Sequence, residues 1–304
     1  MKTRKFHKQQ DFQNFWKNDP DVREHWQFET AIMSRRSKAQ SFLLDGYCKV
    51  CDKPTTFLVD RLFVAQETPQ GWTPNWRERL VCTHCKLINR QRAILHVIKD
   101  TIATRAANEH SISLYAMEQI TPLFAWLNQH FDNVTGSEYL GEKIEGGTII
   151  KGMRHENIEA LSFADQSFDI ILSNDVLEHV NLPERAVAEI YRILKPGGEF
   201  FMTVPFHPNA LKTVRRAELM AYQIKHLLSP IYHGNPLSEK GSLVFNDFGW
   251  DLLEQFKAVG FEEICLCHYW SYFYGYLGEI QQYYFRAYKP LSLLQNSLPI
   301  EMKS

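Results

Sequence analysis

The chain has 304 residues, 44% of them apolar and 23% charged. Its 20 Phe, 13 Tyr and 7 Trp would leave too much apolar surface in water for a disordered or collagen-like chain. The formal net charge of -1 hides a division, because residues 1–110 hold 19 Lys and Arg against 12 Asp and Glu, whereas residues 111–304 hold 15 against 23. This asymmetry predicts two units that meet near residue 110.

The N-terminus is basic and polar, without the apolar core of a secretory signal. No apolar run reaches the ~18 residues that a membrane span needs, and the cysteines are grouped rather than scattered. These features predict a soluble, cytoplasmic protein with no membrane partner. They do not indicate an oligomeric state.

The first unit is expected to contain helices on either side of a small β module. Residues 11–45 and 87–107 show helical spacing of apolar residues, with an interruption at Asp19-Pro20. Between them, residues 46–85 hold short strand-forming runs, such as Thr55 to Val59, separated by turn formers and cysteines.

Four cysteines of this module form two pairs with two residues inside each pair: Cys48, Cys51, Cys82 and Cys85. Each C-x-x-C knuckle directs two thiolates at one point, and two knuckles together complete the tetrahedral sulfur set that Zn²⁺ prefers. Because four protein ligands leave no open position, the spacing predicts a structural zinc ribbon rather than a catalytic centre. Local disulfides or unconnected thiols are the alternatives.

Arg90 and Arg92 closely follow the second knuckle. We expect them either to clamp a phosphate or carboxylate or to lie exposed on a helix. Cys265 and Cys267, two residues apart on an expected strand, are interpreted as packed core thiols.

The second unit alternates expected strands with expected helices, which predicts a parallel α/β sheet covered on both faces. Phe168 to Ser173 is nearly continuous in apolar character, as a strand buried on both sides should be. The expected strands are 112–117, 133–137, 168–173, 199–205, 262–269 and 282–288, and the expected helices are 121–130, 183–194 and 249–259.

Two segments of this unit resemble a known family. Residues 165–180 read DQSFDIILSNDVLEHV, and residues 188–198 read AEIYRILKPGG, in which the Lys-Pro-Gly-Gly turn ends a helix and begins the next strand. The chain resembles class I S-adenosylmethionine-dependent methyltransferases, specifically the ubiquinone-biosynthesis-like (type 11) group. The resemblance implies a Rossmann-like methyltransferase sheet over 111–304, with S-adenosylmethionine across the carboxyl ends of the first strands.

The resemblance also implies which residues bind the cofactor. Glu118 would accept a hydrogen bond from the ammonium group, and Glu138 would accept from both ribose hydroxyls. Asn157 and Ile158 would contact the adenine, and Asn174 would face the sulfonium. The family's glycine-rich first loop corresponds here to residues 113–121, which contain no glycine, so the methionine end of the cofactor must be accommodated differently.

Methyl transfer from a sulfonium is an in-line displacement, and a hydroxyl acceptor must also lose a proton. The candidate bases are His179, His207 and His233. The last two belong to an expected insertion, residues 206–248, which in this fold commonly forms a lid over the substrate. Each of the three histidines could equally have a structural role.

Three function classes remain open within the resemblance. The lid and its aromatic residues favour a methyltransferase for a small molecule, such as a sugar, a nucleotide-sugar or another biosynthetic intermediate, possibly anionic. An RNA or protein methyltransferase that binds its substrate through the zinc ribbon is a second class, although the ribbon lacks the dense Lys/Arg stripe of a nucleic-acid-binding surface. A non-catalytic methyltransferase-like scaffold is the third.

Overall fold

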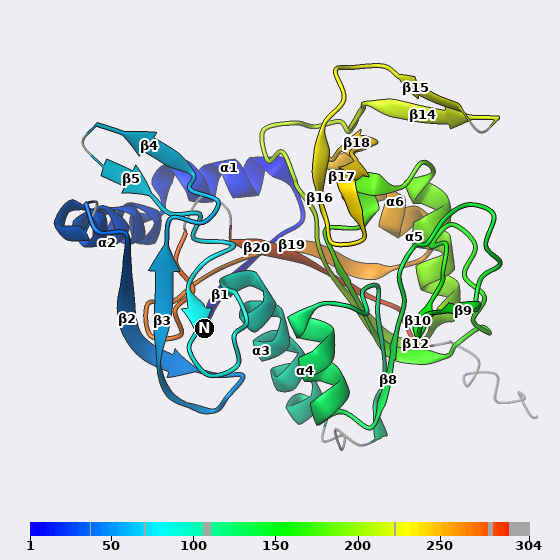
Figure 1. Cartoon of the computed structure of the whole chain (residues 1–304), viewed down its shortest axis with the longest axis horizontal. Coiled ribbons are helices and arrows are strands. Elements are labelled where there is room, and N and C mark those ends of the chain that lie inside the picture. The colour runs from blue at the N-terminus through cyan, green and yellow to red at the C-terminus, as the bar shows by residue number, and fades with distance from the viewer. Residues whose placement is uncertain (37, 70, 106–110, 222, 279–281, 292–304) are drawn as a thin grey trace, which may run out of the picture.

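The structure is a computed structural model that describes residues 1–36, 38–69, 71–105, 111–221, 223–278 and 282–291. A seven-stranded sheet with the order β1-β19-β20-β12-β11-β7-β8 runs through its centre (Figure 1). The strands are β1 (Lys2–Phe6), β7 (Ser113–Ala116), β8 (Asn133–Gly136), β11 (Phe168–Asn174), β12 (Leu194–Thr203), β19 (Glu262–Trp270) and β20 (Tyr283–Tyr288). Strands β8, β7, β11 and β12 are parallel, whereas β20, β19 and β1 pair antiparallel, so the expected parallel sheet is correct for four strands only.

Helices cover both faces of the sheet, which confirms the expected α/β fold class. Along β11, Ile170 and Leu172 enter one hydrophobic cluster and Ile171 enters the other, as the alternation of a strand requires. Helices α3 (Asn89–Thr104) and α4 (Pro122–His130) line the first cluster. The second cluster is lined by α1 (Gln9–Asn18), α5 (Pro183–Ile193) and α6 (Asp251–Ala258).

The N-terminal region contains the cysteine module beside the sheet. Its three-stranded sheet has the order β2-β3-β6, and a separate hairpin joins β4 to β5. The elements here are α2 (Pro20–Arg36), β2 (Ser41–Cys48), β3 (Lys53–Asp60), β4 (Gln66–Thr68), β5 (Gly71–Thr73) and β6 (Val81–Cys82). The expected helix over 11–45 is wrong at its C-terminal end, because Ser41 to Cys48 pair residue by residue with β3 and this tertiary pairing overrides the helical spacing.

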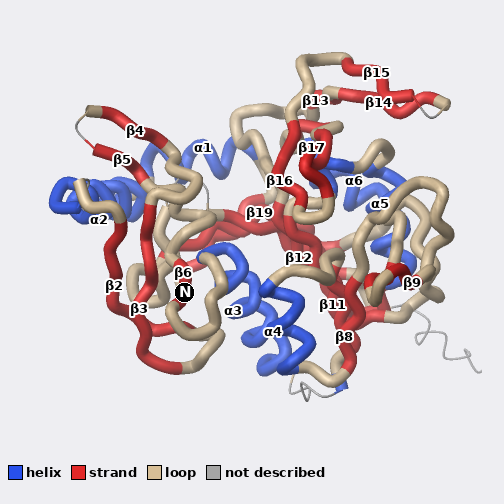
Figure 2. Tube along the Cα trace, in the orientation of Figure 1, coloured by secondary structure: helices blue, strands red, loops and turns tan. Residues whose placement is uncertain are grey.

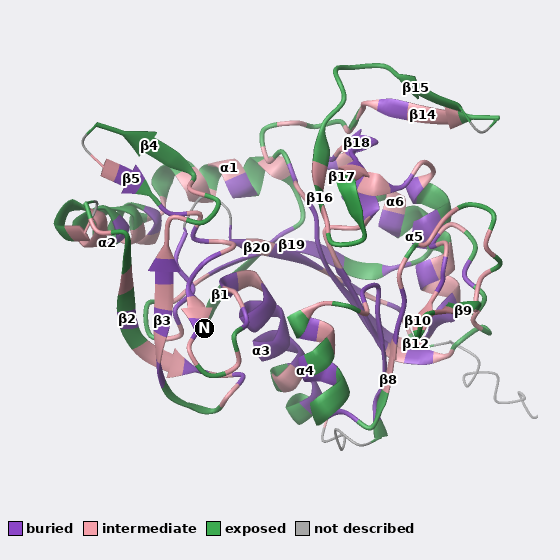
Figure 3. Ribbon diagram, viewed as in Figure 1, coloured by how far each residue is buried: buried purple, intermediate pink, exposed green. Residues whose placement is uncertain are grey.

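The division of the chain at residue 110 stays a prediction, and that boundary lies outside the described residues. Strand β1 extends the central sheet at β19, and α3 is buried along most of its length (Figure 3). Both hydrophobic clusters therefore contain residues from both parts of the chain, although the net charges of the two parts have opposite signs.

Residues 206–248 form a set of short strands above the sheet (Figure 2). Two hairpins, β14–β15 and β16–β17, dominate this segment, and their outer residues are exposed. The strands are β13 (Val214–Arg215), β14 (Ala217–Met220), β15 (Gln223–His226), β16 (Tyr232–Asn235), β17 (Ser238–Leu243) and β18 (Asn246–Asp247). Their role as a substrate lid stays a prediction. None of the described helices combines the length and apolar character that crossing a membrane would require.

Candidate functional site

The carboxyl ends of the parallel strands bring two of the expected cofactor residues into contact. Glu118 follows β7, and Asn174 is the last residue of β11. The Asn174 side-chain amide donates a 2.6 Å hydrogen bond to Glu118, which also accepts from the Thr121 hydroxyl. Burial raises the pKa of the Glu118 carboxyl, and the two hydrogen bonds oppose that shift. Cofactors of doubly wound sheets bind at this edge.

Glu138 lies beside them, two residues beyond the end of β8. Its Oε1 accepts from the backbone amides of Gln119 and Ile120, at 2.7 and 3.1 Å, so it fixes the loop that follows β7. The β8 strand can approach this loop because it ends in glycine: a Cβ on Gly136 would lie 2.8 Å from the Glu118 carbonyl oxygen. A close backbone approach therefore occurs here through Gly136 rather than through a glycine of the preceding loop.

Asn157 and Ile158 closely follow His155, whose backbone forms an isolated β-bridge with Glu138. The Asn157 side chain accepts from the Glu159 amide at 3.0 Å, and Ile158 is buried in the second cluster. The cofactor roles of these two residues, and those of Glu118, Glu138 and Asn174, stay predictions.

Asp175, which follows the last residue of β11, binds Arg77 from the segment between β5 and β6 and Arg90 from the first turn of α3. Its backbone is left-handed, with φ of 51°. Arg77 lies 2.7 Å from one carboxylate oxygen and Arg90 lies 3.5 Å from the other, while Glu78 also contacts both arginines. Burial alone would raise the pKa of Asp175, but the two guanidinium charges outweigh it and hold that pKa well below its usual range. Arg90 thus clamps a carboxylate, and the carboxylate belongs to this chain.

The expectation that Arg92 lies exposed or binds a ligand is wrong. Arg92 is fully buried, donates to the carbonyl oxygens of Leu80, Tyr274 and Gly275, and stacks over the Phe57 ring at 4.1 Å. It joins the cysteine module to the loop after β19, which is a structural role.

A second group of ionisable residues surrounds Glu178, in the short 3-10 helix Leu177–His179. Glu178 Oε1 lies 3.5 Å from His179 Nε2 and 3.4 Å from His233 Nδ1, and His233 reaches it from β16 of the insertion. The contact with Glu178, opposed by burial, raises the pKa of His233. His207 is exposed and lies outside this cluster. The structure thus groups two of the three candidate bases.

The four cysteines of the module lie together, with Cys48 and Cys82 buried. The Cys48–Cys85 and Cys51–Cys82 sulfurs are each 3.9 Å apart. A tetrahedral zinc ion with bonds of about 2.3 Å holds its sulfurs about 3.8 Å apart, so the donor set fits that ion. Cys265 and Cys267 are buried on β19, as core thiols should be.

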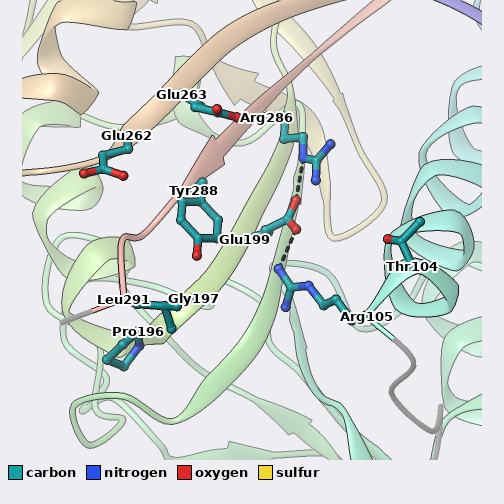
Figure 4. A pocket seen from close by; sticks show the side chains of 10 residues that line it. All are labelled: Thr104, Arg105, Pro196, Gly197, Glu199, Glu262, Glu263, Arg286, Tyr288 and Leu291. Carbon is teal, nitrogen blue, oxygen red and sulfur yellow. Dashed lines mark hydrogen bonds and ion pairs between the residues drawn. The ribbon is translucent and has the colours of Figure 1, made fainter. Parts of the chain in front are cut away.

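A pocket of about 570 Å³ opens elsewhere, near the amino-terminal half of β12 (Figure 4). Within it Glu199 pairs with Arg105 and Arg286, so its charged groups neutralise one another. This pocket is remote from the strand ends where the cofactor residues gather, and we assign it no role in the chemistry.

Comparison with known proteins shows what this arrangement is similar to. Residues 121–202 match the sequence pattern described as "Methyltransferase domain". This segment is similar to that domain. It contains Glu138, Asn174, Asp175 and Glu178, and thus most of the polar strand ends described above.

Individual relatives match parts of the chain. A protein described as a probable S-adenosylmethionine-dependent methyltransferase of Mycolicibacterium smegmatis is 28% identical over 29% of this chain and 40% of its own length. An arsenite methyltransferase of Aquipseudomonas alcaligenes is 32% identical over 45% of this chain and 34% of its own length. The chain therefore spans well under two thirds of these curated relatives. A solved S-adenosylmethionine-dependent methyltransferase from Mesorhizobium loti is 15% identical, with a TM-score of 0.37 over 62% of this chain and 95% of that one.

Sequence reasoning missed two residues near the strand ends, Glu178 and Arg77. Glu178 stands next to His179 in the sequence, but only its burial in the folded chain marks it as a site residue. Arg77 carries no local signal at all, because its partner Asp175 is 98 positions away.

Proposed function

We propose that this chain transfers a methyl group from S-adenosylmethionine to a small-molecule acceptor by in-line displacement. The observation that supports this most is the contact between Glu118 and Asn174, with Glu138 beside them, at the carboxyl ends of adjacent parallel strands. Two carboxylates there offer acceptors for an ammonium group and for a pair of ribose hydroxyls, the polar ends of that cofactor.

The acceptor is proposed to be a small molecule because the four arginines between Arg77 and Arg92 are all engaged within the chain. Arg77 and Arg90 pair with Asp175, Arg79 pairs with Asp60, and Arg92 binds carbonyl oxygens. Nucleic-acid binding depends on exposed Lys and Arg that can neutralise phosphates. A sugar, nucleotide-sugar or similar intermediate therefore suits the remaining surface better than a polynucleotide.

We also propose that the four cysteines bind one structural zinc ion. When bound, that ion would crosslink β2 and β6 of the module, which carry Cys48 and Cys82. Because the four sulfurs would fill its coordination sphere, it would serve the fold rather than the reaction.

Calorimetric titration with S-adenosylhomocysteine tests the cofactor site. The unchanged protein should bind it, and Glu138→Ala should weaken binding by at least about tenfold, because a charge-assisted hydrogen bond contributes about 1.5–3 kcal/mol. Glu142→Ala, an exposed carboxylate in the same loop, is the matched control and should bind normally. Absence of binding by the unchanged protein would favour a non-catalytic scaffold, and steeply salt-dependent binding of RNA would favour a macromolecular substrate.

A further inference from the structure

We propose that Glu178, His179 and His233 bind a divalent transition-metal ion. One ligand atom from each residue lies within 4.8 Å of the other two, and the nitrogens in contact with Glu178 Oε1 are His179 Nε2 and His233 Nδ1. The set combines two imidazoles with a carboxylate, which suits ions such as Zn²⁺, Fe²⁺, Co²⁺ or Mn²⁺.

The spacing of the ligand atoms fits such an ion better than it fits hydrogen bonds. The Glu178 oxygen lies 3.5 Å from His179 Nε2 and 3.4 Å from His233 Nδ1. A tetrahedral ion with bonds of about 2.0–2.1 Å to nitrogen and oxygen separates its ligand atoms by about 3.3–3.4 Å. The imidazole rings are nearly perpendicular, at 83°, so their nitrogens converge on the carboxylate from different directions.

The Glu178 carboxylate itself lacks hydrogen bonds. Its side chain is fully buried, and neither of its oxygens accepts a hydrogen bond from the described residues, since the two imidazole contacts are 3.5 and 3.4 Å long. A buried carboxylate without hydrogen bonds is costly, and buried charges in proteins are normally hydrogen-bonded, paired or bound to a metal. An ion at this position would satisfy Glu178 without moving the backbone.

Neighbouring groups orient the ligands as a metal site requires. His179 Nδ1 lies 2.8 Å from the Leu243 carbonyl oxygen, and only a protonated nitrogen can make that contact. Nε2 of a neutral His179 ring then carries the lone pair and faces Glu178. The Phe245 amide donates to the Glu178 carbonyl oxygen at 2.8 Å, which ties the 3-10 helix to the insertion that carries His233.

Three protein ligands leave at least one coordination position open, in contrast to the cysteine cluster. Resting on the proposed function, we assign that position to a hydroxyl of the acceptor, whose pKa the ion would lower. The hydroxyl loses its proton to solvent, its oxygen forms the new bond to the methyl carbon, and the sulfur–methyl bond breaks with its electron pair left on sulfur. The sulfonium thereby becomes a neutral thioether.

Titration with Co²⁺ tests the site in the full chain already loaded with one zinc per molecule. Cobalt bound by imidazole and carboxylate has visible d–d bands without the thiolate charge-transfer band of a cysteine site, so the two sites are distinguishable. We expect one Co²⁺ without thiolate character, and at least tenfold weaker binding in Glu178→Gln and His233→Ala. His226→Ala, an exposed histidine on the adjacent hairpin, should bind as the unchanged protein does.

Thermal unfolding of each variant shows that it is folded. Equal Co²⁺ affinity in the unchanged protein and both variants, or binding with thiolate bands only, would overturn the proposal and leave a carboxylate–imidazole cluster. Cobalt binding without S-adenosylhomocysteine binding would uphold the metal site and remove the proposed function. The reverse result would uphold the function and remove the metal site.

Discussion

The four-cysteine cluster and the Glu178 cluster both gather ligand atoms at spacings close to those of a tetrahedral ion, but they differ in completeness. The first offers four identical sulfurs from two knuckles. The second offers three atoms of two kinds and leaves a buried carboxylate without a hydrogen-bond partner. A closed ligand set can only stabilise, whereas an incomplete one costs stability and keeps a position free for chemistry.

The comparison predicts its largest effect at the closed cluster. Cys85→Ser removes one thiolate, and structural zinc sites contribute apparent binding free energies of about 10–16 kcal/mol that are also folding free energy. We expect metal analysis to fall from one zinc per chain to well below that, and the thermal transition of the module to disappear. Because Cys48 and Phe57 belong to the same cluster as α3, the central sheet should lose stability as well.

Cys267→Ala is the matched control, since Cys267 is buried but lies outside the zinc set. It should lose some stability and keep its zinc. A Cys85→Ser protein that retains full zinc and an unchanged melting curve would contradict the closed-site interpretation.

The second prediction concerns the ion pairs between the two regions. Arg77→Ala removes the guanidinium that lies 2.7 Å from Asp175 but leaves Arg90 paired with it at 3.5 Å, so we expect a cost of about 1.5–3 kcal/mol, the range of a hydrogen bond to a charged group. The Arg77–Asp175 side chains are 18% and 21% exposed, against 30% and 58% for Arg61–Glu67. Arg61→Ala should therefore cost less than about 1 kcal/mol in the same urea titration.

The pH dependence of that difference has a definite sign. Because the pKa of Asp175 is held low in the folded chain, its stabilisation is complete above the ordinary value of 3.8 and is lost as the pH falls below it. The unchanged protein should lose stability steeply on the acid side, and Arg77→Ala should show a shallower slope there. Parallel slopes would show that Asp175 is not the group responsible.

The central sheet and the cysteine module also differ from the sequence-based expectations in different ways. Regular periodicity located most elements of the sheet domain, for example 168–173 against β11 (Phe168–Asn174) and 121–130 against α4 (Pro122–His130). The cysteine spacing grouped its four residues correctly, because a C-x-x-C knuckle is a local signal. Helix spacing failed at 41–45, where pairing with β3 decided the conformation.

The contacts that define the open cluster have no local signal. His233 reaches Glu178 only because the β16–β17 hairpin folds over the 3-10 helix, and Arg77 reaches Asp175 only because the module packs against the strand ends. Neither contact follows from periodicity or motif spacing. Long-range packing of irregular segments therefore accounts for most of what the sequence could not predict.

The third prediction is a gain of stability, in contrast to the loss expected for Cys85→Ser. At a pH at which His233 is neutral, and in protein that holds zinc only at the cysteines, Glu178→Gln should raise the free energy of unfolding by about 1–3 kcal/mol, since it removes a buried charge without hydrogen bonds and gives His179 Nε2 an amide donor. Added Co²⁺ should stabilise the unchanged protein and not the variant. Glu254→Gln, whose carboxylate is 68% exposed on α6, should change stability by less than about 0.5 kcal/mol.

Destabilisation by Glu178→Gln in metal-depleted protein would show that Glu178 has a partner that satisfies it. The Glu178 cluster would then not be an incomplete ligand set, and its proposed contrast with the four-cysteine cluster would be wrong. Urea titration at fixed pH measures both variants under the same conditions.

The smallest expected effect is on cofactor affinity, and it concerns Glu118, which belongs to neither cluster. Burial raises the pKa of Glu118, so its carboxyl ionises at a higher pH than that of an exposed glutamate. Only the carboxylate attracts the ammonium group of S-adenosylhomocysteine, so affinity should rise with pH until Glu118 is fully ionised and then level off. Glu118→Gln should bind about tenfold more weakly at the plateau, with a flat profile over that range.

Calorimetry across pH gives both curves, with Glu142→Gln as the exposed control. If the variant kept the rising profile, the titrating group would lie elsewhere, and the Glu178 cluster would be the next candidate to substitute.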